Sequence, residues 1–389
     1  MRTAALSEVC HIAMGQAPRG ASYNNDGDGY PLLAGAGDFG EDSPKPSKFT
    51  TEPSKLSAPG DILLCVRATI GDLNWSDKEY CLGRGVAGLR PKNGDLDRNY
   101  LWRWLSFARP ELEKRGRGST FKQVSRKDIA DLEIVLPESA KEQRRIASIL
   151  DKGDAIRRKR RKLATLADDL LKSAYVHTVG YLSPDYYAWT PQRIEQIAEG
   201  KKGSMRTGPF GSALLHSEFV DEGVAVLGID NAVQNCFAWD ERRFITKEKY
   251  EELKRYRVFP RDVLITIMGT TGRSAVVPDD IPEAITTKHL ATITCDLQKV
   301  LPEFLSFAIH SDPQIIRQIE KANKGAIMDG LNLSIIRKLE INVPPLEKQE
   351  NFVRALRILM RVKEQSGSSH TGGDELLASL SQRAFHGEI

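Results

Sequence analysis

The chain has 389 residues, of which 28% are charged and 40% hydrophobic, and it contains 31 glycines and 19 prolines. At roughly 150 residues per domain, this length predicts two or more domains, and the composition excludes collagen-like, mucin-like and wholly disordered proteins. No apolar run approaches the roughly 18 residues of a membrane helix, and the first 20 residues lack a secretory signal pattern. We therefore expect a cytoplasmic protein with no membrane partner. The five cysteines are scattered, without metal-pair spacing, and we expect buried reduced thiols.

The positive charge is concentrated in one segment. The formal net charge is only +4, but residues 138–178 hold eleven basic and six acidic residues. Six cations in a row, residues 157–162, stand at the centre of this segment. Such a block is typical of a solvated helix face or of a surface that meets nucleic acid phosphates or an acidic protein.

The chain repeats itself. Residues 59–64 read PGDILL and residues 260–265 read PRDVLI, an offset of about 201. Further along, residues 84–87 match residues 288–291, and residues 124–137 match residues 331–344, at an offset of about 207. Motifs that keep their order while the offset drifts indicate two copies of one unit of about 200 residues, separated by loop insertions.

Each copy follows the same plan of predicted elements. Short runs rich in Val, Ile, Leu and Thr predict strands at residues 61–67, 85–89, 224–229, 263–267 and 290–294. A helix is expected over residues 98–115 in the first copy and 302–322 in the second. An apolar strand ending at Pro137 or Pro344 closes the globular part, and a long helix follows.

The first long helix is predicted over residues 141–176, a length of about 54 Å. Apolar residues recur on it at heptad spacing, and the second helix carries counterparts, so we expect the two helices to pair with each other. The residues of this seam are Ile146, Ile149, Ile156, Leu163 and Leu170, with Val353, Leu356 and Met360 on the second helix. A Ser/Gly stretch at residues 366–373 interrupts the second helix, which resumes at residues 375–385 and ends with Ala384-Phe385, an echo of Ala174-Tyr175.

These elements predict an α+β protein with two similar domains and two long antiparallel coiled-coil helices, related by an internal pseudo-two-fold repeat. The expected boundaries are residues 1–137 for the first domain, 138–178 for the central helix, 179–344 for the second domain and 345–389 for the C-terminal helical region.

Motifs of catalytic or metal sites are incomplete in the sequence. Residues 35–40 match GxGxxG, but two prolines follow within six residues where a dinucleotide site needs a helix, so we expect a turn-rich loop. The glycine-rich residues 269–274 lack the P-loop spacing, and His216-Ser-Glu218 lacks the cysteines of a zinc deaminase. We predict no catalytic and no metal-binding residues, which favours a binding protein over an enzyme.

Basic and amide side chains occupy corresponding turn-rich segments of both copies. Arg and Lys suit guanine or phosphates, and Asn and Gln suit adenine. The candidate DNA contacts are Gln16, Arg19, Tyr23, Asn24, Arg67, Thr69, Arg84, Arg117, Lys122 and Gln123 in the first copy, and Lys201, Lys202, Arg206, Arg273, Lys288, His289 and Lys324 in the second.

Several short motifs, in this order, resemble the specificity (S) subunit of type I restriction-modification systems. They are residues 14–18 (MGQAP), 27–33 (GDGYPLL), 59–67 (PGDILLCVR), 136–146 (LPESAKEQRRI), 207–212 (TGPFGS), 269–273 (GTTGR), 344–349 (PPLEKQ) and 382–389 (QRAFHGEI). The Ser/Gly break at residues 366–373 departs from the family pattern.

The resemblance implies two target recognition domains, each of which reads one half of a split asymmetric double-stranded DNA sequence. It also implies that the helices dock two methylation (M) subunits, and that restriction (R) subunits join the full complex. This chain is then non-catalytic and needs no cofactor, and S-adenosylmethionine, ATP and magnesium are expected in the partner subunits.

Two other classes remain open from the residues. A stand-alone bipartite DNA-binding regulator explains the duplicated basic loops but not the two long apolar-seamed helices. A coiled-coil scaffold protein explains the helices but not the matched basic loops.

Overall fold

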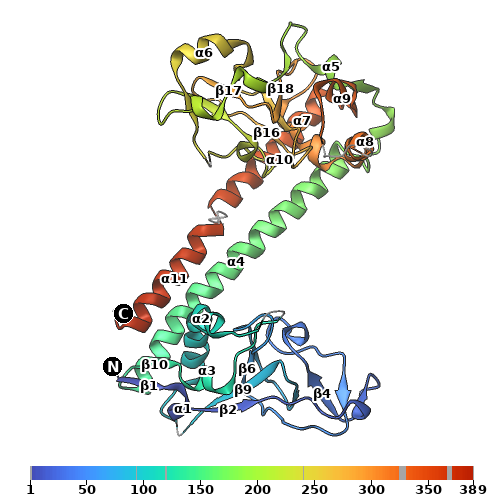
Figure 1. Ribbon diagram of the computed structural model, residues 1–389. Helices are drawn as coiled ribbons and strands as arrows, with labels where there is room; N and C mark the ends of the chain where they lie inside the picture. The colour runs from blue at the N-terminus through green and yellow to red at the C-terminus, as the bar shows by residue number, and fades with distance from the viewer. Residues whose placement is uncertain are drawn as a thin grey trace. The chain divides into compact units, whose positions relative to one another are not determined.

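The computed structural model describes residues 2–92, 94–118, 121–239, 241–323, 330–365 and 370–388. The chain forms two compact units (Figure 1). Unit 1 consists of Met1–Lys162 and Gly367–Ile389, and unit 2 consists of Leu163–Ser366. The boundary between them falls inside the long helix. Each unit therefore contains one globular part and a portion of both helical regions.

Unit 1 is built on two sheets and a short strand pair. The first sheet has the antiparallel order β2-β9-β6-β7, formed by Cys10–Met14, Val86–Pro91, Ile62–Cys65 and Leu73–Trp75. The second has the order β3-β5-β4-β8, formed by Tyr23–Asn24, Phe49–Thr50, Tyr30–Leu33 and Cys81–Leu82, with β4 and β8 parallel. The pair consists of β1 (Arg2–Ala5) and β10 (Glu133–Leu136), which closes the globular part as the sequence predicts.

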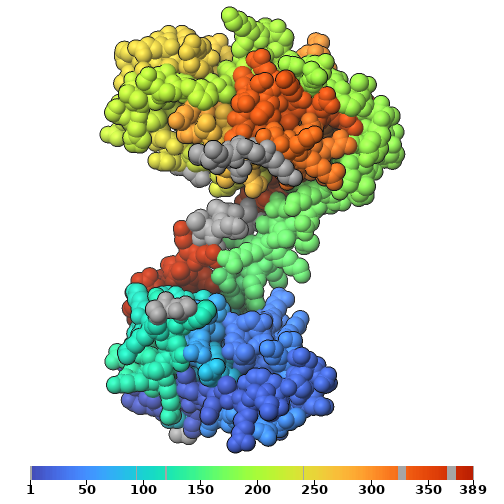
Figure 2. Space-filling model, turned by 45° about the vertical axis from the view of Figure 1, so that its right-hand side comes forward, coloured from blue at the N-terminus to red at the C-terminus, as the bar shows by residue number. Residues whose placement is uncertain are grey.

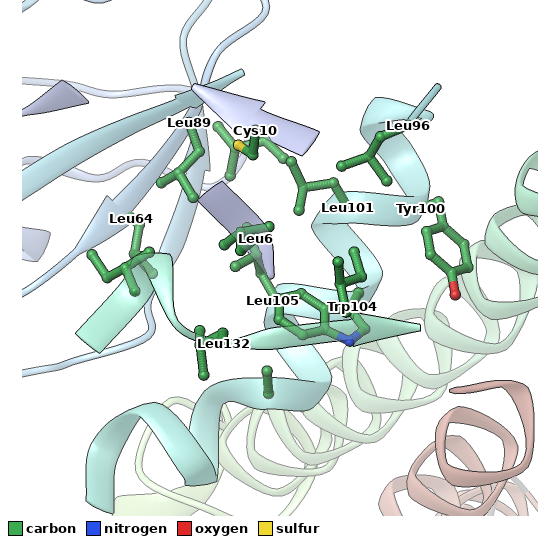
Figure 3. Close-up of a cluster of buried hydrophobic side chains, with 14 of the residues drawn as sticks. Leu6, Cys10, Leu64, Leu89, Leu96, Tyr100, Leu101, Trp104, Leu105 and Leu132 are labelled. Atoms are coloured by element: carbon green, nitrogen blue, oxygen red, sulfur yellow. The ribbon is translucent and has the colours of Figure 1, made fainter. Parts of the chain in front are cut away.

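The core of unit 1 lies between the first sheet and α2 (Arg98–Arg115), as Figure 3 shows. Leu64 and Leu89 come from the sheet, and Leu101 and Leu105 come from the helix. The helix begins where the Asp97 carboxylate accepts the N–H groups of residues 99 and 100, which would otherwise lack partners. Its bounds confirm the helix predicted over residues 98–115. Two short helices, α1 (Leu6–Val9) and α3 (Arg126–Ala130), complete the globular part.

Unit 2 repeats this strand order, except that its second sheet has three strands and no named strand in the place of β3. Its first sheet is β12-β18-β15-β16, formed by Met205–Thr207, Leu290–Ile293, Val263–Thr266 and Ser274–Val276. Its second sheet is β14-β13-β17, formed by Phe244–Ile245, Val224–Leu227 and Ala284–Thr286, with β13 and β17 parallel. The strand pair is β11 (Pro191–Arg193) with β19 (Glu340–Asn342). The shared order, including one parallel pair in each second sheet, confirms the predicted repeat.

Unusual backbone conformations also recur at equivalent turns. Gly71 and Gly272 have φ of +93° and +80°, a region that side chains rarely adopt. A Cβ at Gly71 would lie 2.5 Å from Cγ of Arg109, so this turn admits only glycine. The two copies therefore share local geometry as well as topology.

One helix prediction in unit 2 is wrong. Instead of a single helix over residues 302–322, the chain forms α7 (Pro302–Ser311) and α8 (Pro313–Asn323), with Asp312 in an extended conformation between them. Pro313 has no N–H to continue the first helix and disfavours helical geometry in the residue before it. At this break the Asp312 carboxylate accepts hydrogen bonds from the hydroxyls of Tyr175 (3.0 Å) and Tyr186 (3.1 Å).

The remaining short elements are turns and caps. Unit 2 also contains α5 (Ile194–Ile197), α6 (Lys247–Leu253) and α9 (Leu333–Lys338). Single 3-10 turns occur at Gly20–Ser22, Ala36–Asp38, Tyr186–Ala188, Gly211–Ala213, His216–Glu218, Ile229–Asn231 and Lys254–Tyr256. The GxGxxG segment is thus a turn, closed by the Asp38 carboxylate, which accepts the N–H of Ala34 at 2.6 Å. The helical part of this segment is the single 3-10 turn Ala36–Asp38.

The long helix α4 (Ala140–Thr178) is continuous over 39 residues, about 58 Å, and runs from unit 1 into unit 2. The second helical region comprises α10 (Leu346–Gln365) in unit 2 and α11 (His370–His386) in unit 1. The long helical stretches predicted in both regions are therefore confirmed, but the prediction that the interruption lasts to residue 373 is wrong, because α11 begins at His370. Residues 366–369 of the predicted Ser/Gly break lie outside the described residues.

Within each unit the long helices pack as antiparallel neighbours. In unit 1, Leu377 and Leu380 of α11 pack against Gly153 of α4, and Figure 2 shows the red surface of α11 against the green surface of α4. Phe385 completes the unit 1 core beside Tyr100, at 5.4 Å between ring centroids. In unit 2, Tyr175 near the end of α4 packs against Phe352 of α10 at 5.5 Å. The predicted echo of Ala384-Phe385 and Ala174-Tyr175 is real, since each aromatic ring lies in the core of a unit.

The predicted seam is only partly correct. Ile146 and Val353 are buried, and Ile149, Leu356 and Met360 are half-buried. The prediction that Ile156, Leu163 and Leu170 pack against the chain's own second helix is wrong, because these side chains are 52%, 43% and 55% exposed.

The face of α4 that is buried instead carries Ala147, Leu150 and Asp154 in unit 1, and Ala167 and Leu171 in unit 2. Asp154 belongs there because it pairs with Arg103 of α2 (3.2 Å) and Arg157 (2.7 Å). The heptad prediction assumed an apolar residue at every buried position of the helix. It therefore missed a buried face that includes the Asp154 carboxylate. None of the helices in the described part of the chain is long and apolar enough to cross a membrane.

Candidate nucleic-acid interface

Four loops of unit 1 lie side by side at one edge of the first sheet, joined by main-chain hydrogen bonds. Gln16 N donates to Leu82 O (2.8 Å), and Val66 N donates to Gly85 O (2.9 Å). Ala68 N donates to Lys122 O (3.2 Å), which adds the fourth loop. The unit 1 loop cluster is defined by residues 14–16, 66–69, 82–86, 116–118 and 121–124.

The cluster brings together seven of the ten candidate DNA contacts of the first copy. They are Gln16, Arg67, Thr69, Arg84, Arg117, Lys122 and Gln123. Four of these side chains are cationic, and most are exposed to solvent, with Arg67 and Gln123 half-buried. An exposed group of cations with amide and hydroxyl neighbours has the chemistry that phosphates and base edges require.

Two features fix the loops in place. Arg117 and Gln123 exchange main-chain hydrogen bonds of 3.0 and 2.9 Å, which hold these two residues side by side. Ala68 has φ of +59°, a conformation that non-glycine residues seldom adopt, and the equivalent position in unit 2 is Gly269 with φ of +74°. Such backbone strain is typical of functional loops that the surrounding structure holds in one shape.

Unit 2 contains three of these loops in the same arrangement. Ile267 N donates to His289 O (2.9 Å), and Leu331 N donates to Ile267 O (2.8 Å), which matches the bonds of Val66 in unit 1. These bonds define the unit 2 loop cluster, residues 267–271, 287–290 and 330–331. Lys288 is exposed on it and His289 is half-buried.

The surroundings of His289 favour its uncharged form. Burial lowers the pKa of His289, and the charges of Lys288 and Arg243 lower it further. A neutral imidazole has one donor and one acceptor nitrogen, so His289 can hydrogen bond to a base edge without adding charge.

Three candidates of unit 1 lie on or just before the second sheet rather than in the loop cluster. Arg19 precedes a turn, and Tyr23 and Asn24 form β3. The amide of Asn24 is already engaged, because it donates to Asp28 O (3.0 Å) and accepts from the N–H of Asp28 (3.1 Å). Asn24 therefore stabilises its own turn, whereas Arg19 and Tyr23 remain exposed.

The prediction that Arg206 contacts DNA is wrong. Its side chain is 8% exposed and forms an ion pair with Asp262, which is fully buried. It also donates to Arg257 O (2.8 Å) and Gly203 O (3.1 Å), so its donors are used inside the unit. The equivalent aspartate in unit 1, Asp61, binds Arg90 from a different strand (2.6 Å). Both copies thus pair this aspartate with an arginine, but the arginine comes from β12 in unit 2 and from β9 in unit 1.

The other candidates of unit 2 are dispersed. Lys201 and Lys202 precede β12, at the end of that strand opposite the unit 2 loop cluster, and Lys201 pairs with Glu199 at 2.5 Å. Arg273 lines a cavity of about 740 Å³ between α4, α7 and α10, together with His310. Lys324 lies outside the described residues.

Sequence reasoning passed over one exposed residue of the unit 1 loop cluster. Phe121 stands between Arg117 and Lys122 in the sequence, and its side chain is 71% exposed. The available signal was a single aromatic residue in a Gly- and Lys/Arg-rich loop, with no apolar neighbour in sequence to pack against.

Two units of one topology, each with a loop cluster of exposed polar and basic side chains, define a duplicated binding protein of the nucleic-acid-recognition class. The family model "Type I restriction modification DNA specificity domain" matches residues 1–167 and 189–366. The chain belongs to this family, and sequence-specific DNA recognition is the function that follows from it.

Curated relatives agree with this assignment. A putative type I restriction enzyme MjaX specificity subunit of Methanocaldococcus jannaschii is 39% identical over 139 residues, a match that spans 36% of this chain and 32% of the relative. The EcoBI specificity subunit of Escherichia coli is 22% identical over 99% of this chain and 85% of the relative.

The fold is also that of a solved specificity subunit. The S subunit of a type I restriction-modification system from M. genitalium covers 99% of this chain and 96% of its own, with a TM-score of 0.68 at 16% identity. The α+β fold with two similar domains is therefore confirmed.

Proposed function

We propose that the chain is the DNA-reading subunit of a type I restriction-modification complex, and that each unit reads one half of a split asymmetric target. The observation that carries this proposal is the recurrence of one loop cluster in two units of the same topology. Two readers with different side chains on one frame suit a target whose halves differ in sequence.

The exposed apolar row of α4 supports a role in docking methylation subunits. Ile156, Leu163 and Leu170 are spaced seven residues apart and are largely exposed, and Leu166 nearby is 54% exposed. Residues at this spacing share one side of a helix and form the contact row of coiled coils. We propose that helices of the methylation subunits cover this row.

The chemistry is assigned to partner chains. Methylation would use S-adenosylmethionine, and cleavage by restriction subunits would use ATP and magnesium, all bound outside this chain. This division accounts for a sequence that offers readers and docking rows but no complete catalytic motif.

A domain exchange tests the proposal. Residues 1–137 are replaced by the corresponding domain of another family member, and the methylated sites are mapped in cells that also express the methylation subunit. We expect one half of the target to change while the other half persists. The reciprocal exchange of residues 179–344 is the matched control and should change only the other half. A single exchange that altered both halves would contradict separate reading.

A further inference from the structure

Phe121 is a large apolar side chain in a place that folding does not require. It is 71% exposed on the unit 1 loop cluster, whereas the aromatic residues of the unit 1 core, such as Tyr100 and Trp104, are almost fully buried. Covering a phenyl ring contributes about 1.5–3 kcal/mol, so this position leaves a sizeable contribution available to a binding partner.

The loop presents this ring on a closed base. The two hydrogen bonds between Arg117 and Gln123 tie the ends together, and Val124 N donates to Val66 O (3.1 Å) beneath them. Gly118 has φ of +128°, and a Cβ there would lie 2.4 Å from Phe121 O. Only glycine fits this close approach of residue 118 to the Phe121 carbonyl.

The surroundings of the ring indicate the kind of partner. Arg117 is 86% exposed and Lys122 is exposed. The backbone of Arg67 forms an isolated antiparallel β-bridge with Gln123, which places a third cation beside them. Lysine is depleted at the cores of protein interfaces, and the exposed Lys122 adjoins the ring in sequence, which favours a partner that carries phosphates. Cations beside an exposed ring match DNA, whose phosphates would meet the cations while the ring reaches the bases.

We infer that Phe121 inserts as a wedge between two neighbouring base pairs of the half-site that unit 1 reads. Apolar side chains that enter a base step unstack it partly and bend the duplex, and the ring gains the burial that it lacks in the free protein. The inference rests on the proposed function, because it specifies how one unit contacts its half-site.

The test uses the full chain assembled with its methylation subunits and a duplex that carries the mapped target. The fluorescent adenine analogue 2-aminopurine replaces, one at a time, each adenine on either strand in and beside the first half-site, because its emission rises when the base loses its stacking. We expect a rise at one step with the parent protein, lost with Phe121→Ala and retained with Phe121→Trp. The Ala variant should bind the target roughly 10- to 100-fold more weakly.

Two controls make the result specific. Tyr187→Ala removes another ring that is 79% exposed, in unit 2, and should leave the affinity and the fluorescence profile of the first half-site unchanged. The thermal melting of Phe121→Ala should equal that of the parent, because an exposed ring adds little to folding. A fluorescence rise that persists in Phe121→Ala belongs to a partner subunit rather than to the wedge.

Equal affinity and an unchanged fluorescence profile in Phe121→Ala would overturn the wedge while leaving the proposed function intact. A second outcome would also overturn the wedge. In it, 2-aminopurine emission rises at no step of the half-site with the parent protein, and replacing one thymine by deoxyuridine reproduces the loss of affinity. The ring would then contact a thymine methyl group instead of entering a base step. A parent complex that bound no mapped target selectively would instead overturn the proposed function itself.

Discussion

Arg206 and Asp262 show how a basic residue in a turn-rich segment can be structural. Both side chains are buried, and Asp262 also accepts the Phe259 N–H (2.8 Å) and the Thr294 hydroxyl (2.6 Å). Removing one partner of a buried pair leaves an uncompensated charge, which typically costs 3–5 kcal/mol.

We therefore expect Arg206→Met to lower the free energy of unfolding by about 3–5 kcal/mol, measured by denaturant titration. Arg90→Met is the matched control, because Arg90 pairs with the equivalent aspartate but is 53% exposed, and its loss should be clearly smaller. Equal losses in the two variants would show that burial does not set the strength of these pairs.

The exposed cations of the unit 1 loop cluster behave differently, because they are open to solvent; Arg117 is 86% exposed, although it lies 3.6 Å from Asp128. If Arg117 and Lys122 each contact one phosphate, Arg117→Gln and Lys122→Gln should each reduce the slope of log binding constant against log salt by about 0.9. Salt-dependent binding to the mapped target measures this slope, with little change expected in stability.

Lys201→Gln removes an exposed cation that lies at the far end of β12 and should leave the slope unchanged. If this variant lowered the slope as much as Arg117→Gln, the assignment of the interface to the loop clusters would fail.

At the scale of elements, α4 carries two kinds of apolar residue at similar spacing. Leu150 and Leu171 are buried within their units, whereas Ile156 and Leu163 are exposed. Burying a charge is costly and exposing one is not. A change to Asp should therefore lower the stability at the buried positions but not at the exposed ones.

We expect Ile156→Asp with Leu163→Asp to keep the melting temperature of the parent but to lose methylation subunits, as judged by co-purification. Leu150→Asp should lower the melting temperature strongly. A double variant that still assembled fully would mean that the exposed row of α4 is not the docking surface.

Two carboxylates of unit 1, Asp374 and Asp154, form ion pairs with arginines of α4 and α2. Asp374 of α11 binds Arg157 (3.1 Å) and Arg161 (2.6 Å), and the hydrogen bond from Arg157 lowers the pKa of Asp374. Burial alone would raise the pKa of Asp154, but Arg103 and Arg157 outweigh it and the pKa is lowered.

Carboxylates whose pKa falls on folding stabilise the protein above their unfolded value, about 3.9 for aspartate, and lose this contribution as the pH drops through the folded value. We thus expect the stability of unit 1 to decline as the pH falls below about 4. Thermal melts over a pH series should show a weaker decline in Asp374→Asn, and an identical decline would remove Asp374 from the cause.

For the whole molecule, the repeat and the long helices were predictable because they leave periodic signals in the sequence. Matching motifs at a drifting offset anticipated sheets with the same strand order, and the proline-free segment anticipated α4. Local signals of this kind depend on a few neighbouring residues, so they can be recognised without knowing the tertiary structure.

Burial was harder to predict because it depends on partners far along the chain. Whether Arg206 faces solvent depends on Asp262, 56 residues away, and which face of α4 is covered depends on Arg103 of α2 and Leu377 of α11. Composition and spacing alone made Arg206 resemble a reader and made Ile156 resemble a core residue.

The frame of the two loop clusters is made of peptide groups, and this has an evolutionary consequence. The bonds from Val66 N to Gly85 O and from Ile267 N to His289 O use atoms that nearly every amino acid supplies. Exposed side chains on these loops can change by single mutations while the scaffold stays folded. A lineage can thus acquire a new recognition sequence in small viable steps, without passing through a protein that fails to fold.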